Sequence, residues 1–149
     1  MATTRLPIDF KEFLQLLNAH KVEYLLVGGY AVGYHGYPRA TIDLDLWVAR
    51  HSQNAKKLVL VLRNFGFDVE GLSEDLFLEE NKIVRMGEPP IRIEIITSAS
   101  GVNFKECYKN RVIDSFDDVP VNVISLKHLK LNKKAAGRHK DLDDLENLP

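Results

Sequence analysis

Two aspartates stand one residue apart in the otherwise apolar segment 42–48 (IDLDLWV). Side chains alternate between the two faces of a strand, so Asp43 and Asp45 share one face, with Cα atoms roughly 6.5 Å apart. At such a short distance two ionised carboxylates repel one another, and without a cation the pKa of at least one of them rises. The pair therefore predicts a solvent-exposed face or a cation site, and oxygen ligands favour Mg²⁺ (or Mn²⁺).

A third acidic residue, Glu94, lies in the middle of segment 91–97 (IRIEIIT), where a buried charge is costly unless it is paired. If this strand lies beside segment 42–48, three carboxylates can bind one or two metal ions. Such a site holds nucleotide phosphates and stabilises an in-line displacement at phosphorus. The alternative is that the aspartates lie on a solvated strand face and that Glu94 pairs with Arg92.

A glycine pair, Gly28-Gly29, follows the apolar segment 23–27 and precedes a possible short helix. Glycines at such a junction let backbone N–H groups approach phosphates. Their spacing from Gly33 and Gly36 fits neither the P-loop nor the dinucleotide-binding fingerprint. The alternative is an ordinary tight turn.

Taken together, Gly28-Gly29 and the segment Arg39-x-Thr41-x-Asp43-x-Asp45 resemble the signature of the DNA polymerase β-like nucleotidyltransferase superfamily. The resemblance implies a small mixed sheet flanked by helices and transfer of a nucleoside monophosphate from an NTP to an acceptor hydroxyl. The acceptor would belong to RNA, a protein or a small molecule. The site residues that it implies are Asp43, Asp45 and Glu94 for Mg²⁺ (or Mn²⁺) and catalysis, and Gly28, Gly29, Arg39 and Thr41 for the nucleotide.

Near the end of the sequence, Lys134-x6-Asp141-x2-Asp144 resembles a motif of one branch of this superfamily. That branch contains the abortive-infection-type toxin nucleotidyltransferases of bacterial toxin–antitoxin systems. The resemblance implies active-site roles for Lys134 and Asp141, and a helical partner or antitoxin protein. The alternative is a pair of amphipathic helices whose charged side chains are solvated.

A rival function from another class is a non-catalytic nucleotide-binding or regulatory protein with the same fold. The orientation of Glu94 distinguishes the two, because a Glu94 that points away from the aspartates removes the base that catalysis needs. Two other features remain open at this stage. Trp47 shares the strand face of the aspartates and either stacks on a base or packs in the core, and the stripe Lys127, Lys130, Lys133 and Lys134 either meets phosphates or is solvated.

The composition is that of an ordinary globular protein: 149 residues, 45% hydrophobic, with a formal net charge of −1. We expect one nucleotidyltransferase domain over residues 1–149, with no global field that attracts nucleic acid or membrane. The single cysteine, Cys107, excludes an internal disulfide. The sequence contains no apolar run of bilayer-spanning length and no signal peptide, so a cytoplasmic location is expected.

Hydrophobic periodicity predicts helices over 8–20, 53–66, 126–136 and 138–148, with Ser125 as a helix cap and Gly66 and Gly137 as helix stops. It predicts strands over 23–27, 42–48, 82–86, 91–97 and 119–125, and a short helix within 103–110. Helices and strands mixed in this way indicate an α+β (α/β) domain around a small mixed sheet.

Overall fold

The structure, a computed structural model, describes residues 5–38, 40, 43–88 and 91–149. In this part of the chain six strands form one mixed sheet, in the order β3-β4-β2-β1-β6-β5. The pairs β2–β4 and β1–β6 are parallel and the other neighbours are antiparallel. The strands are β1 (Tyr24–Val27), β2 (Asp43–Val48), β3 (Ile83–Glu88), β4 (Ile91–Ile96), β5 (Val112–Phe116) and β6 (Val119–Val123).

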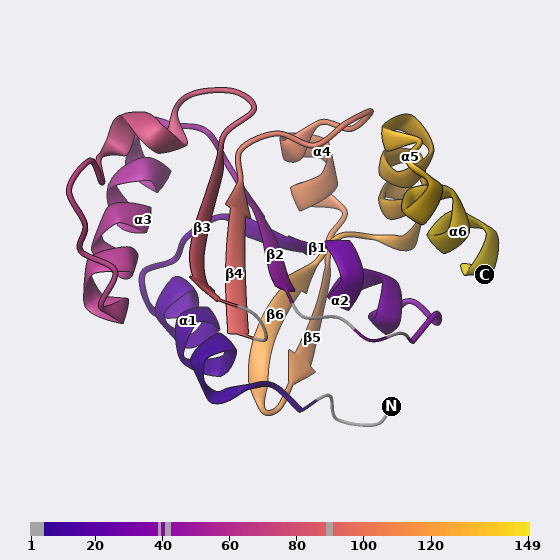
Figure 1. Ribbon diagram of the computed structural model, residues 1–149, viewed down its shortest axis with the longest axis horizontal. Coiled ribbons are helices and arrows are strands. Elements are labelled where there is room, and N and C mark those ends of the chain that lie inside the picture. Colours follow the sequence, from indigo (N-terminus) through magenta and orange to yellow (C-terminus); the bar gives the residue numbers. More distant parts are fainter. Residues whose placement is uncertain (1–4, 39, 41–42, 89–90) are drawn as a thin grey trace.

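Helices cover the sheet from both sides. Figure 1 shows α1 (Ile8–Ala19) and α3 (Ser52–Phe65) on one side, and α2 (Gly28–Tyr34), α5 (Leu126–Ala136) and α6 (His139–Asn147) on the other. Two short elements complete the described chain: the 3₁₀ turn η1 (Glu74–Phe77) and α4 (Phe104–Lys109). The predicted fold class, a mixed sheet flanked by helices, is confirmed.

The alternation along β2 separates the core from the site. Leu44 and Leu46 are fully buried, whereas Asp43 and Asp45 point to the opposite face and remain partly accessible. Burial of each leucine contributes about 1.5–3 kcal/mol. The apolar members of the strand therefore fix its register, and with it the face on which the aspartates lie.

The predicted helix ends are confirmed at three residues. The Ser125 hydroxyl accepts a hydrogen bond from the His128 N–H (3.2 Å) at the start of α5. Gly66 and Gly137 end α3 and α5 with left-handed φ values of 103° and 65°. Within the described residues, no helix has the length and apolarity needed to cross a membrane.

One strand, β5, was not predicted from the sequence. It forms a hairpin with β6 through Asp117 and Asp118, whose φ values of 51° and 66° are left-handed. Asp tolerates this conformation better than most residues, and two such residues make the tight turn that suits a hairpin. The Asp-Asp pair between Phe116 and Val119 was the signal available in the sequence.

Candidate active site

The site begins with the parallel pairing of β2 and β4. Asp45 lies opposite Glu94 and Asp43 opposite Arg92, so all four side chains project from one face of the sheet. Carboxylate oxygens of Asp43, Asp45 and Glu94 lie within 4.8 Å of one another, and each of these residues is partly buried. The three acidic residues expected at the site are therefore brought together, from two strands that are far apart in the sequence.

Two arginines contact this acidic cluster. Arg92 binds Asp43 through two hydrogen bonds, Nε to Oδ1 at 3.1 Å and Nη2 to Oδ2 at 2.8 Å. The Arg85 Nε donates to Glu94 Oε1 at 2.9 Å, and the Arg92 Nε lies 3.6 Å from the same oxygen. The sequence left open whether Glu94 joins the aspartates or pairs with Arg92. In the structure it does both.

The central aspartate, Asp45, has the most perturbed acidity of the three. Burial, the interaction with Glu94 and the charge of Asp43 together raise the pKa of Asp45 to about 7, and Lys140 partly opposes them. This carboxyl therefore keeps its proton to a higher pH than an ordinary aspartate. A divalent cation among the three carboxylates would favour the ionised form.

Gly28 lets Asp45 occupy its position. It stands where β1 passes directly into α2, with a left-handed φ of 67°. A Cβ atom added there would overlap the Asp45 carboxylate, lying only 2.8 Å from its Cγ and 2.9 Å from its Cβ. Gly29, the next residue, is buried in the first turn of α2. The other expected nucleotide-binding residues, Arg39 and Thr41, lie outside the described residues.

A buried ion-pair cluster links α5 to α6. The Lys133 Nζ lies 3.2 Å from Asp141 Oδ1 and 3.0 Å from Asp144 Oδ2, and the three side chains are at most 5% exposed. The exposed side chain of Arg138 adds a 2.7 Å hydrogen bond from Nε to Asp141 Oδ2. Burial alone would raise the pKa of Asp141, but the hydrogen bonds from Arg138 and Lys133 outweigh it and lower the pKa.

The structure places Lys133, and not Lys134, beside Asp141. Successive residues of a helix differ by about 100° in direction, so the two lysines project from different sides of α5. Lys134 lines a separate groove of about 420 Å³ with Lys127, Lys130 and Leu145. The sequence held a signal for Lys133, which lies four residues after the buried Leu129 and so shares its inward face.

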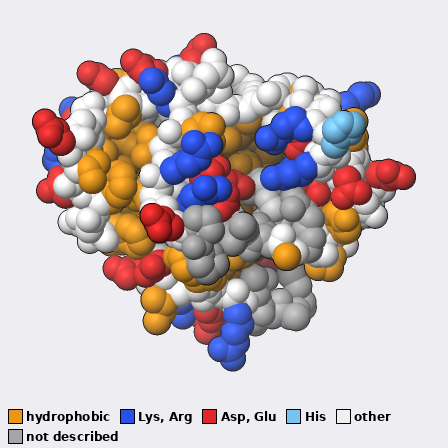
Figure 2. Space-filling view, in the orientation of Figure 1, with side chains coloured by type: hydrophobic (Ala, Val, Ile, Leu, Met, Phe, Trp, Pro, Cys, Tyr) orange, Lys and Arg blue, Asp and Glu red, His pale blue; other side chains and the backbone are white. Residues whose placement is uncertain are grey.

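These groups line one cavity of about 510 Å³. Acidic side chains gather near the middle of the face shown in Figure 2, with lysine and arginine side chains on either side of them. Sequence reasoning had assigned no role to Arg138, and Lys140 had not been singled out either. The site residues that line the cavity are Gly28, Asp43, Asp45, Glu94, Lys133, Arg138, Lys140 and Asp141.

The mixed sheet with helices on both of its sides gives the chain the fold of a nucleotidyltransferase. Solved structures agree, although no protein-family model and no curated protein sequence matches the chain. The provisionally assigned nucleotidyltransferase TM1012 of Thermotoga maritima superposes with a TM-score of 0.63 at 14% identity, over 92% of this chain and 88% of its own.

Two further solved structures share the fold. The lincosamide antibiotic adenylyltransferase LnuA, solved with lincomycin bound, superposes with a TM-score of 0.57 at 17% identity over 97% of both chains. An antigenic nucleotidyltransferase-like protein of Paracoccidioides brasiliensis gives 0.55 at 20% identity, over 92% of this chain and 72% of its own. The resemblance inferred from the glycine pair and the aspartates is thus confirmed at the level of the fold.

Proposed function

We propose that this chain is a metal-dependent nucleotidyltransferase that moves a nucleoside monophosphate from an NTP to an acceptor hydroxyl. The observation that carries the proposal is the meeting of Asp43, Asp45 and Glu94 within 4.8 Å on one sheet face. The adenylyltransferase activity named for LnuA, which shares the fold, supports the same class of reaction. The proposed unit is a single domain over residues 1–149.

The donor set fits Mg²⁺ or Mn²⁺. It consists of carboxylate oxygens alone, which suit hard cations, and burial together with the charges of Glu94 and Asp43 raises the pKa of its central member, Asp45, to about 7. Asp43, Asp45 and Glu94 would hold the ion. Once bound, the metal would supply charge neutralisation at the α-phosphate and make the acceptor hydroxyl more acidic.

The residues of the chain then have distinct tasks. Glu94 accepts the proton of the acceptor hydroxyl while the hydroxyl oxygen bonds to the α-phosphorus of the NTP. The bond from that phosphorus to the oxygen that bridges to the β-phosphate breaks, which releases pyrophosphate. Arg138 and Lys140, on the cavity wall, attract the phosphates. Lys133 holds Asp141 in place, and Asp141 in turn orients the Arg138 guanidinium. From the resemblance, Gly28, Gly29, Arg39 and Thr41 would contact the nucleotide.

The rival function, a non-catalytic nucleotide-binding or regulatory protein, has one observation in its favour. Arg92 and Arg85 form ion pairs with Asp43 and Glu94, two of the three proposed metal ligands. The position of Glu94 beside the aspartates favours catalysis, because a purely binding site has no need of a base there. The two functions differ in whether nucleotide, once bound, is transferred.

From the resemblance we also propose that the protein is a cytoplasmic component of a toxin–antitoxin system. Its partner would be a helical protein or an antitoxin. The groove that Lys134 lines on α5 and α6 is the surface that we assign to that partner. It combines lysines with Leu131, which is 45% exposed. An acidic amphipathic helix would complement both features.

Radiolabel transfer tests the proposed function. Each NTP labelled at the α-phosphate is incubated with the protein, Mg²⁺ or Mn²⁺ and a mixture of cellular RNA, protein and small metabolites. We expect label to move to an acceptor with wild type and to fall at least about 100-fold with Asp43→Asn/Asp45→Asn. Asp68→Asn, which changes an exposed aspartate in the segment after α3, is the control and retains activity.

The same samples separate the two functions when NTP binding is measured by calorimetry. Metal-dependent NTP binding without transfer to any acceptor would favour the regulatory function. Equal and negligible NTP binding by wild type and the double variant would refute both.

A further inference from the structure

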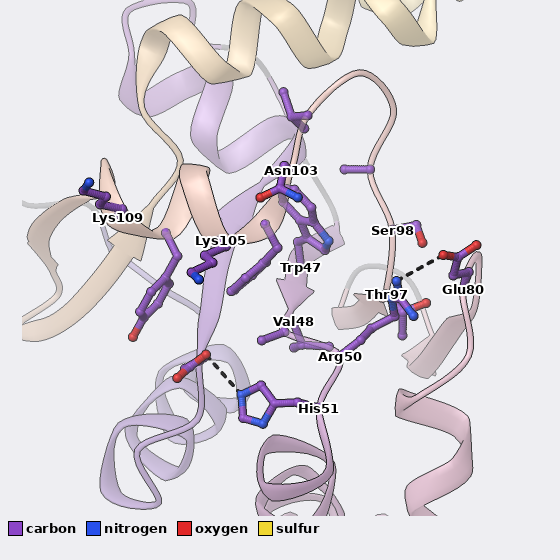
Figure 3. A pocket seen from close by; sticks show the side chains of 16 residues that line it. Trp47, Val48, Arg50, His51, Glu80, Thr97, Ser98, Asn103, Lys105 and Lys109 are labelled. Carbon is purple, nitrogen blue, oxygen red and sulfur yellow. Dashed lines mark hydrogen bonds and ion pairs between the residues drawn. The ribbon is translucent and has the colours of Figure 1, made fainter.

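A second and larger cavity, of about 860 Å³, opens at the carboxyl ends of β2 and β4 beneath α4 (Figure 3). Its size lies in the range of sites that bind small organic molecules. Its walls come from the end of β2, the segment after β4 and the exposed side of α4. The proposed chemistry at the carboxylates uses none of these side chains.

Aromatic rings form one wall of this cavity. Trp47 meets Phe104 edge to face at 5.1 Å between ring centroids, and Phe104 stacks on Tyr108 at 5.5 Å. The sequence left open whether Trp47 stacks on a base or packs in the core. In the structure it packs in the core, with only 3% of the residue exposed, and it also lines this cavity. Such a wall favours a flat ring system as the ligand.

The indole N–H of Trp47 is a buried donor that has no hydrogen-bond partner among the described residues. Leaving a buried donor unpaired costs about 1–3 kcal/mol, so buried polar groups nearly always find a partner. Figure 3 shows the indole nitrogen on the ring edge that faces the Ser98 side of the cavity. A small adjustment of the ring would let a ligand acceptor atom take this hydrogen bond.

The charges around the cavity are mostly paired with one another. Arg50 pairs with Glu80 and His51 with Glu23, each at 3.2 Å. Lys105 is exposed on α4, and the described part of the chain offers it no ion-pair partner within 4.0 Å. Lys109, also on α4 and on the cavity wall, is exposed too and has no ion-pair partner in that part of the chain. Two unpaired cations beside an aromatic wall suit a ligand with an acidic group.

This aromatic cavity adjoins the carboxylate site. Ser98 and Ala99 line both cavities, and Trp47 is the next residue after Asp45 on the same face of β2. Alternate residues of a strand are roughly 6.5 Å apart, less than the length of a bicyclic ring compound. A molecule seated against Trp47 can therefore extend a substituent past Ser98 toward the carboxylates.

We propose that the aromatic cavity binds the acceptor, a small ring compound that bears an acidic group and the hydroxyl to be modified. The inference rests on the proposed nucleotidyl transfer and assigns its acceptor to a small molecule rather than to RNA or protein. The separation of the two cavities supports it, because the three carboxylates border the other cavity together with Arg138 and Lys140, and that is where the metal and the NTP phosphates belong. The aromatic cavity contains none of these carboxylates and offers two lysines, Lys105 and Lys109, that have no ion-pair partner among the described residues.

Binding of 6-hydroxynaphthalene-2-sulfonate tests the cavity directly. This probe combines a flat bicyclic ring, a hydroxyl and one acidic group. Trp47 is the only tryptophan of the chain, so quenching of its fluorescence reports contact at this wall. We expect saturable one-to-one quenching, weakened about fivefold by Lys105→Glu and unchanged by Lys56→Glu, an exposed lysine on α3 outside the cavity. Absence of quenching, or equal binding by both variants, would overturn the proposal.

A second titration distinguishes an acceptor from the base of the NTP. With saturating MgATP, we expect the probe to bind as well as without nucleotide, giving a ternary complex. Displacement of the probe by MgATP, together with weaker ATP binding by Lys105→Glu, would assign the cavity to the nucleotide base and overturn the acceptor assignment.

Failure of the acceptor proposal can be told apart from failure of the proposed nucleotidyl transfer. Asp43→Asn/Asp45→Asn should bind the probe as wild type does, because neither residue lines the aromatic cavity. Probe binding without transfer would leave the cavity intact as a binding site while the enzymatic proposal fails. Transfer of label to RNA or protein without probe binding would support the enzymatic proposal and overturn the acceptor proposal.

Discussion

At the scale of single residues, two consecutive lysines of α5 have opposite environments. The Lys133 ammonium is buried between Asp141 and Asp144, whereas Lys134 lines the groove on the other side of the helix. Removing one partner of a buried ion pair leaves an uncompensated charge, which costs more than the pair itself contributes. The position of the lysine within the helical repeat thus decides whether it supports the site.

The first prediction follows from this contrast. Lys133→Met should lower the free energy of unfolding by about 3 kcal/mol or more, because Asp141 and Asp144 lose a buried cation. Lys134→Met should change it by less than about 0.5 kcal/mol. Urea denaturation of both variants measures the difference. Similar losses in the two would show that the burial of Lys133 is not what holds α5 to α6.

Arg92 supports the second prediction, since its guanidinium occupies both oxygens of Asp43. Arg92→Gln should lower the melting temperature of the metal-free protein, because Asp43 loses its bidentate counter-charge and Glu94 loses one of its two arginine partners. The same change should strengthen Mn²⁺ binding about threefold or more, because a competing cation is gone. Calorimetric titration with Mn²⁺ tests this, with Arg63→Gln on the surface of α3 as the control. Weaker Mn²⁺ binding by Arg92→Gln would contradict it.

At the scale of elements, the junction between β1 and α2 controls how closely a backbone approaches Asp45. The strand passes into the helix at Gly28 without an intervening loop. Its positive φ and the missing Cβ are both needed, the first for the turn and the second for the space that the Asp45 carboxylate fills. A glycine motif read from the sequence as a phosphate contact therefore has a packing role as well.

The third prediction separates the backbone conformation of Gly28 from the space that its missing Cβ leaves for Asp45. Gly28→Ala should destabilise the protein by at least about 2 kcal/mol, because the left-handed backbone costs about 1–2 kcal/mol and the overlap with Asp45 adds to it. Gly71→Ala has a comparable φ of 89° with nothing within 4 Å, so it carries the backbone cost alone. Thermal unfolding and Mn²⁺ titration should show a larger loss for Gly28→Ala in both. Equal effects of the two substitutions would exclude the overlap.

The elements differ in how far the sequence alone could define them. The strands that carry Asp43, Asp45 and Glu94 were predicted because their apolar residues recur with strand periodicity. Their neighbourhood in the sheet followed only from the resemblance, because strand pairing depends on contacts between distant segments. The strand β5 was missed because its turn contains aspartates in place of glycine. Lys134 was predicted at the site, whereas the structure places Lys133 beside Asp141, because motif spacing does not show which helix face is buried.

At the scale of the whole molecule, the acidic cluster links stability to pH. The pKa of Asp45 lies at about 7 in the folded state and near its ordinary value of 3.8 when unfolded, so between these values the folded protein binds the extra proton. Its contribution to stability is therefore fully present below about pH 4 and is lost as the pH rises toward 7. Asp141, whose pKa is lowered, acts in the opposite direction and in the more acidic range.

The fourth prediction concerns this pH dependence. In EDTA, the Asp45 contribution should make wild type lose stability between pH 5 and pH 8 relative to Asp45→Asn. Addition of Mg²⁺ should restore more stability at pH 8 than at pH 5, because only the ionised carboxyl binds the ion. Thermal melts at both pH values, with and without Mg²⁺, provide the measurement. An identical pH slope in wild type and Asp45→Asn would contradict the assignment.

The central claim, that the three carboxylates on β2 and β4 form a metal site for nucleotidyl transfer, is tested most directly by diffraction. Crystals soaked with Mn²⁺ and a non-hydrolysable ATP analogue should show an anomalous peak coordinated by Asp43, Asp45 and Glu94. The Arg92 guanidinium should then have left Asp43, and the analogue phosphates should approach Arg138. An anomalous peak elsewhere, with Arg92 still bound to Asp43 and no ion among the carboxylates, would contradict the claim.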